Sequence, residues 1–327
     1  MRVGIVGSGT MGEVHAAAWR ATEAELVGVF AANTNQSKGL AEKFGCQVLG
    51  SYAELLKSVD IVDICVPTYL HKEMVLEAAR SQKQVVCEKP IALSIADGRE
   101  MIDACNKAGV RLFVAMVVRF FPQYRLAREL VAKGQIGNLG VLRLKRVAYV
   151  PQKPLDNWYA DESRSGGMLV DLMIHDFDYA RWLAGPVERV YARSSRTLYP
   201  ELPGDYAQAI LRFKSGAMAL VEGGWVYPPG VFRTAIDLSG TDGLIEWNSD
   251  EPAPVRTLMA SKDGSASSVG LPTSGLSEDP YTTEIRHAYD CIVTGKPFDV
   301  AAEDGLEALR ISLAARESLS TGKPVNL

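Results

Sequence analysis

The stretch Val3-Gly4-Ile5-Val6-Gly7-Ser8-Gly9-Thr10-Met11-Gly12 decides the fold of this chain. Its apolar start predicts a buried strand, and the residues from Met11 onward have the periodicity of a helix. The glycines between them follow the spacing Gly-x-Gly-x-x-Gly, which allows a tight turn, the close approach of a pyrophosphate and close helix–strand packing. The N-terminus of the helix favours the anion. We predict a dinucleotide site here; the alternative is a glycine-rich turn without a ligand.

The same alternation of short apolar runs and amphipathic stretches continues to residue 116. We expect strands at 2–7, 25–30, 61–66, 84–88 and 112–116, and helices at 11–20, 37–44, 52–57, 70–81 and 95–108. Strands that are almost entirely apolar and alternate with helices indicate a parallel sheet covered on both faces. With right-handed crossovers, this predicts a doubly wound Rossmann sheet.

The pattern changes near residue 119. A helix at 122–132 is followed by longer strands that alternate apolar and polar residues, at 139–150, 187–197, 206–213, 217–225, 234–239 and 243–248. Such strands predict a mostly antiparallel sheet with one covered face. Helices are expected at 168–183, 283–294 and 302–320, and surface loops at 250–279. We therefore predict a dinucleotide-binding domain at 1–118 and a second, α/β domain at 119–327, with the last helix a candidate to pack back on the first domain.

The composition limits the kinds of partner. The 327 residues include 35 basic and 39 acidic side chains, a net charge of −4, which argues against nucleic acid as a partner. Neither a membrane-spanning apolar run nor a signal peptide is expected. The five cysteines are scattered without a Cys-x-x-Cys pair, which indicates reduced thiols and a cytoplasmic location.

The end of the second strand should select the cofactor. An acidic residue there would bind the adenosine ribose of NAD, but Ala31 and Ala32 stand in its place. Four polar residues follow that could donate to a 2′-phosphate: Asn33, Thr34, Ser37 and Lys38. We expect NADP(H) to be preferred and keep NAD(H) as the alternative, in which these are ordinary loop residues and both cofactors bind.

Two further motifs carry candidate chemistry. Glu88-Lys89-Pro90 stands at the carboxyl end of a buried strand, the edge where open α/β sheets bind ligands. A solvated Glu–Lys pair is the alternative. In the predicted helix at 168–183, Asp171 and His175 are four residues apart and share one face. His175 is otherwise a core or cap histidine; a metal site needs further ligands, so no metal is predicted.

These motifs together resemble the glucose–fructose oxidoreductase, inositol dehydrogenase and rhizopine catabolism family (Gfo/Idh/MocA). The resemblance rests on the glycine motif followed by His15, on Glu88-Lys89-Pro90, and on Gly-Gly-x-x-x-Asp-x-x-x-His at 166–175. It extends over nearly the whole chain through the motifs at 67–71, 119–122 and 303–305. It implies an NAD(P)-binding domain at 1–118 and a substrate-binding and oligomerisation domain at 119–327, whose large, open, mostly antiparallel sheet forms a homodimer or homotetramer. It also implies NAD(P)-dependent oxidation or reduction of sugars, inositols or polyols.

The resemblance also assigns residues by position. It places Lys89, Asp171 and His175 at the catalytic positions. Cofactor contacts fall on Gly7, Gly9, Thr10, Met11, Gly12, Pro67, Thr68, His71, Glu88 and Lys89. To these we add Ala31, Asn33, Thr34 and Lys38 from the loop after the second strand. Candidate substrate contacts are Arg119, Tyr149, Asn157 and Trp158, then Tyr159 and Tyr227, with core packing the alternative for the aromatic residues.

Hydride transfer needs a proton acceptor for the substrate hydroxyl and a donor that stabilises alkoxide character. His175 fits the first role and Lys89 the second, while Asp171 orients His175 or binds a neighbouring hydroxyl. The main hypothesis is a dehydrogenase or reductase of a sugar or polyol. The alternatives are a non-catalytic, dinucleotide-sensing regulatory protein and a metal-dependent lyase or hydrolase on the same scaffold.

Overall fold

The computed structural model describes residues 1–151, 157–195, 205–249 and 279–327. The chain forms two compact units. The first consists of Met1–Phe120 with Leu276–Leu306, and the second of Phe121–Gly275 with Glu307–Leu327. The domain division between residues 118 and 119 stays a prediction, and the loops expected at 250–278 lie outside the described residues.

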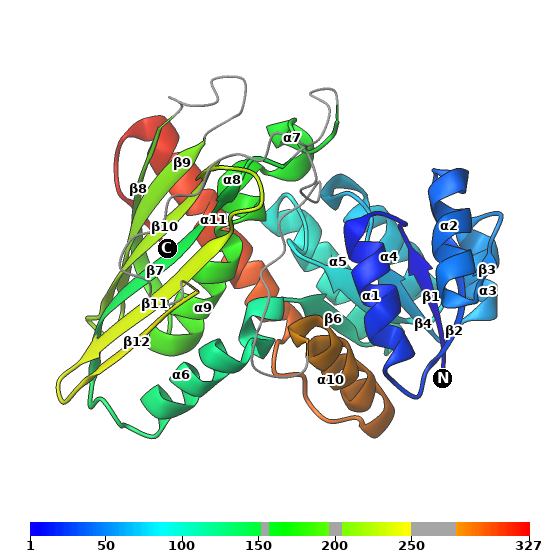
Figure 1. Cartoon of the computed structure of the whole chain (residues 1–327), viewed down its shortest axis with the longest axis horizontal. Coiled ribbons are helices and arrows are strands. Elements are labelled where there is room, and N and C mark those ends of the chain that lie inside the picture. The colour runs from blue at the N-terminus through cyan, green and yellow to red at the C-terminus, as the bar shows by residue number, and fades with distance from the viewer. Residues whose placement is uncertain (152–156, 196–204, 250–278) are drawn as a thin grey trace. The chain divides into compact units, whose positions relative to one another are not determined.

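The first unit contains a six-stranded sheet in the order β3-β2-β1-β4-β5-β6 (Figure 1). Its strands are β1 (Arg2–Val6), β2 (Glu25–Phe30), β3 (Gln47–Val48), β4 (Ile61–Ile64), β5 (Gln84–Glu88) and β6 (Leu112–Ala115). All neighbouring strands run parallel. The expected Rossmann sheet is therefore confirmed, although the two-residue strand β3 was not predicted.

Six α-helices of the described residues belong to this unit. They are α1 (Thr10–Arg20), α2 (Thr34–Phe44), α3 (Tyr52–Ser58), α4 (His71–Arg80), α5 (Ile95–Ala108) and α10 (Pro280–Thr294). Short 3-10 turns, η1 (Thr68–Leu70) and η2 (Val117–Phe120), follow β4 and β6. Ser94 begins α5 by accepting a hydrogen bond from the backbone of Asp97. Although α10 comes from the far end of the chain, it packs on α1, where the rings of Trp19 and Tyr289 meet edge to face.

The second unit contains a seven-stranded sheet in the order β12-β11-β7-β10-β9-β8-β13. Its strands are β7 (Leu139–Tyr149), β8 (Val187–Ser195), β9 (Tyr206–Phe213), β10 (Met218–Tyr227), β11 (Arg233–Gly240), β12 (Leu244–Asn248) and β13 (Val325–Asn326). The β10–β7 pair is parallel and the other pairs are antiparallel, which confirms the mostly antiparallel sheet. Burial alternates strictly along β9, so one face is covered and the other is open.

The helices of the second unit correct one prediction. They are α6 (Pro122–Ala132), α7 (Glu162–Ser165), α8 (Gly167–Asp171), α9 (Ile174–Ala184) and the longer part of α11 (Ala302–Thr321). A single helix over 168–183 is wrong, because α8 and α9 are separated at Leu172 and Met173. There the backbone N–H of Met173 reaches back five residues to the carbonyl of Met168, which widens the turn. The side chain of Met173 lies directly over Gly223 of β10, and this packing holds the widened turn against the sheet.

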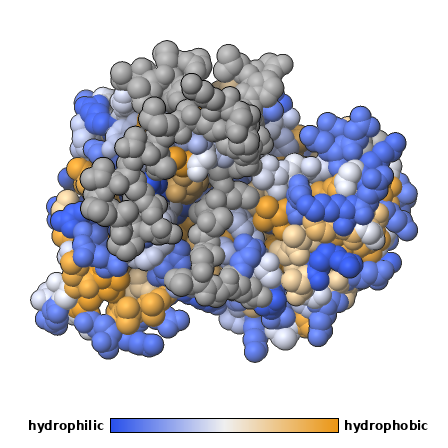
Figure 2. All heavy atoms as spheres, viewed as in Figure 1, coloured by the Kyte–Doolittle hydropathy of each residue, from blue (hydrophilic) through white to orange (hydrophobic). Residues whose placement is uncertain are grey.

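No helix among the described residues combines the length and apolar character needed to span a membrane. All five cysteines are free thiols, and three of them, Cys87, Cys105 and Cys291, are buried. Figure 2 shows a mainly hydrophilic surface over α2, the helix that carries Lys38.

Candidate functional site

The glycine turn joins β1 to α1 as the sequence predicts. Gly7 has a φ of +110°, and a Cβ there would lie 2.3 Å from the carbonyl oxygen of Cys65, so only glycine fits. A Cβ on Gly12 would lie 2.2 Å from the carbonyl oxygen of Gly7. A Cβ on Gly9, by contrast, would meet no atom of the described residues within 4 Å. The turn is therefore closed where it packs on the sheet and open where an anion would approach.

The start of α1 is suited to an anion. Gly9 occupies the position before the helix and offers no side chain, so among the described residues no side-chain hydrogen bond caps this end. The first turn, with Thr10 and Met11, thus presents backbone N–H groups beside the open space at Gly9. A pyrophosphate would accept from these groups and gain from the helix dipole. The residues present fit a dinucleotide.

The loop after β2 is only partly free to bind a phosphate. The side chain of Asn33 accepts a hydrogen bond from the backbone of Gln36 and so caps α2. Ser37 is buried, with its hydroxyl donating to the carbonyl of Asn33. Ala31 is half-buried and Lys38 is exposed on α2, whereas the side chain of Thr34 lies outside the described residues. Lys38 is thus the cation that this loop presents to solvent.

The loops after β4 and β5 are joined by His71. This side chain is 1% exposed, with Nδ1 2.9 Å from the carbonyl oxygen of Pro90 and Nε2 3.0 Å from that of Val66. Burial lowers the pKa of His71, so the neutral ring donates to only one of these carbonyls. Pro67 precedes η1 and Thr68 is buried within it. His71 therefore supports the segment that carries Lys89, and its predicted contact with a cofactor stays a prediction.

A buried charged cluster, which the sequence analysis did not identify, lies beneath this segment. The imidazole of His15 on α1 is fully buried, with Nδ1 2.8 Å from Oδ2 of Asp63 on β4. Its Nε2 lies 3.0 Å from Oε1 of Glu88, whose Oε2 accepts from the backbone N–H of Lys89. Glu284 of α10 is also fully buried. Asp63 could have been found as the one acid in a buried apolar strand, and Glu284 as an acid on the apolar face of its helix.

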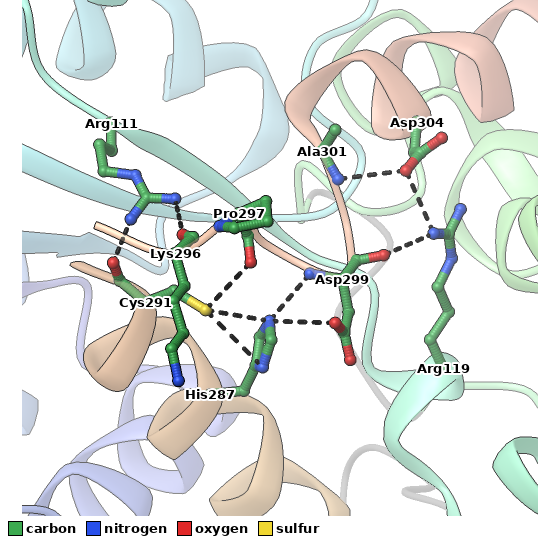
Figure 3. A network of polar contacts seen from close by, with 9 residues as sticks. All are labelled: Arg111, Arg119, His287, Cys291, Lys296, Pro297, Asp299, Ala301 and Asp304. Carbon is green, nitrogen blue, oxygen red and sulfur yellow. Dashed lines mark hydrogen bonds and ion pairs between the residues drawn. The ribbon is translucent and has the colours of Figure 1, made fainter. Parts of the chain in front are cut away.

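Arg119 belongs to a polar network that the sequence analysis did not predict (Figure 3). Its side chain is 2% exposed, and Nη1 donates to the carbonyl oxygen of Asp299 at 3.0 Å and to Oδ2 of Asp304 at 3.1 Å. Asp304 also accepts from the backbone of Ala301 and so fixes the start of α11. The structure thus gives Arg119 a role in holding the first unit together, and its predicted contact with a substrate stays a prediction.

The Asp–His motif lies in the second unit. Asp171 ends α8 and His175 stands in the first turn of α9; both side chains are half-buried. The hydroxyl of Tyr159 donates to Oδ2 of Asp171 in a short contact. Burial raises the pKa of Tyr159 and the Asp171 charge raises it further, so the phenol keeps its proton. Lys89 belongs to the first unit.

The other predicted substrate contacts lie at the end of β7, in the segment before α7 and at the end of β10. Tyr149 is buried at the end of β7. Asn157 and Trp158 are half-buried, and Oδ1 of Asn157 accepts from the backbone of Tyr159. The ring of Tyr159 packs against Trp158 and Trp225. The half-buried Tyr227 ends β10.

A parallel Rossmann sheet with an open phosphate-binding turn, followed by a separate α/β unit, is typical of the NAD-binding oxidoreductases. The comparisons with known proteins identify the family within this class. Residues 1–116 match the GFO_IDH_MocA model, described as an oxidoreductase family with an NAD-binding Rossmann fold. Residues 124–246 match the GFO/IDH/MocA C-terminal domain. The chain belongs to this family and is an oxidoreductase.

Similar proteins include dehydrogenases and a reductase. The chain is 32% identical to the myo-inositol 2-dehydrogenase of Thermotoga maritima, with 100% of this chain and 98% of the relative covered. It is 28% identical to the 1,5-anhydro-D-fructose reductase of Ensifer adhaerens, with 100% and 98% covered. The crystal structure of a probable dehydrogenase from Thermotoga maritima superposes with a TM-score of 0.86 at 31% identity, covering 100% and 99% of the two chains.

Proposed function

We propose that this protein is an NAD(P)-dependent dehydrogenase or reductase that acts on a CH–OH group of an inositol, a sugar or a related polyol. The bound nicotinamide would supply the acceptor or donor of hydride. The same residues serve both directions, so oxidation and reduction are one proposal. Two relatives, an inositol dehydrogenase and an anhydrofructose reductase, support a cyclic polyhydroxylated substrate.

The observation that carries this proposal is the phosphate-binding turn. Gly7 and Gly12 close it against the sheet, while the space at Gly9 is open and the start of α1 is not capped by a side chain of the described residues. The proposed cofactor contacts continue along the carboxyl edge of the sheet through Thr68 and Glu88, where ligands of open α/β sheets bind.

The proposed catalytic roles follow from the chemistry of three side chains. His175 holds the proton of the reacting hydroxyl as general acid or base, because an imidazole titrates near neutral pH. Lys89 donates to the same oxygen and stabilises its alkoxide character. Asp171 orients His175 or accepts from a neighbouring hydroxyl, and the hydroxyl of Tyr159 holds that carboxylate in place. Arg119, Tyr149, Asn157 and Trp158 remain proposed substrate contacts.

The cofactor preference is a finer part of the proposal. We propose that NADP(H) binds more tightly than NAD(H), because no carboxylate stands at Ala31 or Ala32 to repel a 2′-phosphate. The exposed ammonium of Lys38 supports this preference, whereas Asn33 is engaged in capping α2. The NAD-binding description of the family supports NAD(H) as the second cofactor.

Cofactor titration followed by a substrate screen tests the proposal. NADPH and NADH are titrated into the purified protein by nucleotide fluorescence, and inositols, aldoses and anhydrosugars are then screened with the tighter cofactor. His175→Ala should bind the cofactor with unchanged affinity, Lys89→Ala should still bind it, and both should lose about 10²–10³-fold in kcat. Full turnover in either variant, or a wild-type protein that binds neither cofactor, would contradict the proposal.

We also propose that the chain assembles as a homodimer or homotetramer through the open face of the second sheet. This face presents the exposed side chains of Ile210, Met218 and Leu220 on β9 and β10. The same sheet also carries charged side chains, including the ion pair between Arg143 of β7 and Asp237 of β11. Light scattering of the wild type and of Leu220→Arg tests this, because a buried arginine without a partner should dissociate the assembly.

A further inference from the structure

His15 is held between two carboxylates from different strands. Asp63 of β4 lies 2.8 Å from Nδ1, and Glu88 of β5 lies 3.0 Å from Nε2, although the second N–H is not aligned for a strong hydrogen bond. The indole N–H of Trp19 donates to the same Asp63 oxygen that contacts His15. Burial alone would lower the pKa of His15, but its interactions with Asp63 and Cys65 together outweigh burial and raise the pKa well above its ordinary value. His15 is therefore an imidazolium that links both strands.

The titratable groups that face this imidazolium come from three parts of the chain. Asp63 and Cys65 belong to β4 and the loop after it, Glu88 to β5, and Glu284 to α10. Burial, and then the charge of Glu88, raise the pKa of Glu284 well above its ordinary value. Neither carboxyl oxygen of Glu284 has a hydrogen-bond partner among the described residues. Glu284 is thus neutral, and the ionised members of the cluster are one imidazolium and two carboxylates.

A metal bound in this cluster would have to displace protons. The donor atoms of His15, Asp63 and Cys65 lie within 4.8 Å of one another, which is close enough for a shared ion. However, a histidine must be neutral to ligate a metal. Burial also raises the pKa of the Cys65 thiol, so the sulfur keeps its proton. The cluster is organised around a proton on His15.

The cluster ends at the segment that carries Lys89. While Oε1 of Glu88 faces His15, its Oε2 accepts from the backbone N–H of Lys89 at 3.0 Å. On the other side of this segment, His71 contacts the carbonyl oxygen of Pro90. The backbone N–H of Lys89 is therefore held by a side chain of β5, and the carbonyl of the next residue, Pro90, by a side chain of α4. Glu88 can hold the Lys89 amide only if its own carboxylate is held, and His15 holds it.

We propose that His15 is a positioning residue that acts through the carboxylate of Glu88 to fix the backbone at Lys89. The effect on turnover rests on the proposed function, in which Lys89 donates to the reacting oxygen. The effect on the Lys89 backbone rests only on the contacts within the first unit. The two parts can therefore be tested separately.

A matched pair of substitutions isolates the Glu88 contact. In His15→Gln the side-chain amide reaches the position of Nε2 and keeps a donor towards Glu88. In His15→Asn the amide reaches the position of Nδ1 and keeps only the donor towards Asp63. Both variants lose the charge and a similar packing volume, so general loosening of the fold affects both. Leu55→Ala, in a fully buried position on α3, is the control for loosening without a change in the cluster.

The first readout is hydrogen exchange at the Lys89 amide, observed in ¹⁵N-lysine-labelled protein and assigned with Lys89→Arg. We expect exchange to be at least about tenfold faster in His15→Asn than in His15→Gln, with Leu55→Ala like the wild type relative to neighbouring amides. Equal exchange rates in the two variants would overturn the proposal, whether or not the protein proves to be a dehydrogenase.

The second readout is turnover. Cofactor affinity and KM should stay within about threefold in both variants, whereas kcat should fall about tenfold or more in His15→Asn only. If the exchange rates differ but kcat does not, the role assigned to Lys89 fails and the positioning contact stands. If neither variant folds, ¹⁵N-histidine spectra of the wild type decide: both nitrogens of His15 must carry protons at neutral pH, and a bare Nε2 would refute the proposal.

Discussion

Nη1 of Arg119 donates to Oδ2 of Asp304 at 3.1 Å and so joins η2 to the first turn of α11, 185 residues further along the chain. The guanidinium is almost fully buried, and it also donates to the carbonyl oxygen of Asp299. Asp299 in turn donates its backbone N–H to Nε2 of His287, whose ring packs against Phe120. The arginine thus stands at the centre of a structural network within the first unit.

Arg119→Met should therefore destabilise the protein by about 2–4 kcal/mol, because it leaves Asp304 without its cation and Asp299 without a donor. Urea unfolding measures this loss. Arg143→Met removes an exposed arginine from its ion pair with Asp237 and is the control, expected to cost less than about 1 kcal/mol. An unchanged stability together with a raised substrate KM would instead assign Arg119 to the substrate.

The geometry of the glycine turn predicts that Gly9→Ala affects cofactor binding and that Gly12→Ala affects stability. Gly9→Ala places a methyl group in open space, so the stability of the free protein should change by less than about 1 kcal/mol. The same methyl would occupy the space proposed for the pyrophosphate, and cofactor affinity should fall about tenfold or more. Fluorescence titration and thermal unfolding report the two effects. Tight cofactor binding by Gly9→Ala would argue against a phosphate at this turn.

Gly12→Ala is the counterpart. Its methyl group would lie 2.2 Å from the carbonyl oxygen of Gly7, so the backbone must shift. We expect a loss of about 1–3 kcal/mol in the free energy of unfolding, as in other overpacked sites, before any cofactor is added. A Gly12→Ala protein as stable as Gly9→Ala would show that the turn is looser than its backbone geometry indicates.

The sequence predicted the Rossmann sheet closely because its signals are local. Apart from β3, each parallel strand coincides with an apolar run of the sequence. The ends of α5 are likewise marked by local residues, Ser94 before the helix and Gly109 after it. The break between α8 and α9 was not predictable in this way. Residues 168–183 have continuous helical periodicity, and the turn at Met173 depends on packing against Gly223, a residue distant in sequence.

In the candidate site, too, features formed by adjacent residues were predicted and features formed by distant residues were not. The glycine turn and Glu88-Lys89-Pro90 were visible as motifs whose chemistry is confined to adjacent residues. The buried cluster was not visible, because it joins His15, Asp63 and Glu284 from three separate parts of the chain. Likewise, the sequence did not indicate that Arg119 contacts Asp299 and Asp304, because both lie far from it along the chain.

Glu284 makes the stability of the protein depend on pH. Its pKa is raised in the folded state, so folding retains a proton that the unfolded chain releases above its ordinary value of 4.5. Stability should therefore fall as the pH rises from that value through the folded-state pKa, by about 1.4 kcal/mol for each unit of the shift. Glu284→Gln removes the charge, so it should be more stable than the wild type at pH 8 and equally stable near pH 4.

Thermal unfolding over this pH range measures the difference. Glu42→Gln, at an exposed position on α2, is the matched control and should follow the wild type. If the wild type and Glu284→Gln lose stability in parallel as the pH rises, the carboxyl group of Glu284 is ionised in the folded protein and the charge count of the cluster is incorrect.

Tyr159→Phe tests the support of Asp171. The variant keeps the ring that packs on Trp225 but loses the hydroxyl that donates to Oδ2 of Asp171. We expect kcat to fall about tenfold, the effect of losing one hydrogen bond to a charged group, with cofactor affinity unchanged. Steady-state kinetics with a fluorescence titration of the cofactor checks both. A kcat equal to that of the wild type would remove Tyr159 from the catalytic arrangement.

The packing of α10 on α1 determines how the gene can be divided. The helix at Pro280–Thr294 contributes Tyr289 to the ring of Trp19 and Glu284 to the cluster around His15, although it is encoded more than half a chain later. A fragment that ends at residue 118 would leave a buried imidazolium and a tryptophan open to water, and we expect it to aggregate when expressed alone. The nucleotide-binding unit therefore cannot be moved into another protein as one contiguous segment; a transplant must carry both stretches of the chain.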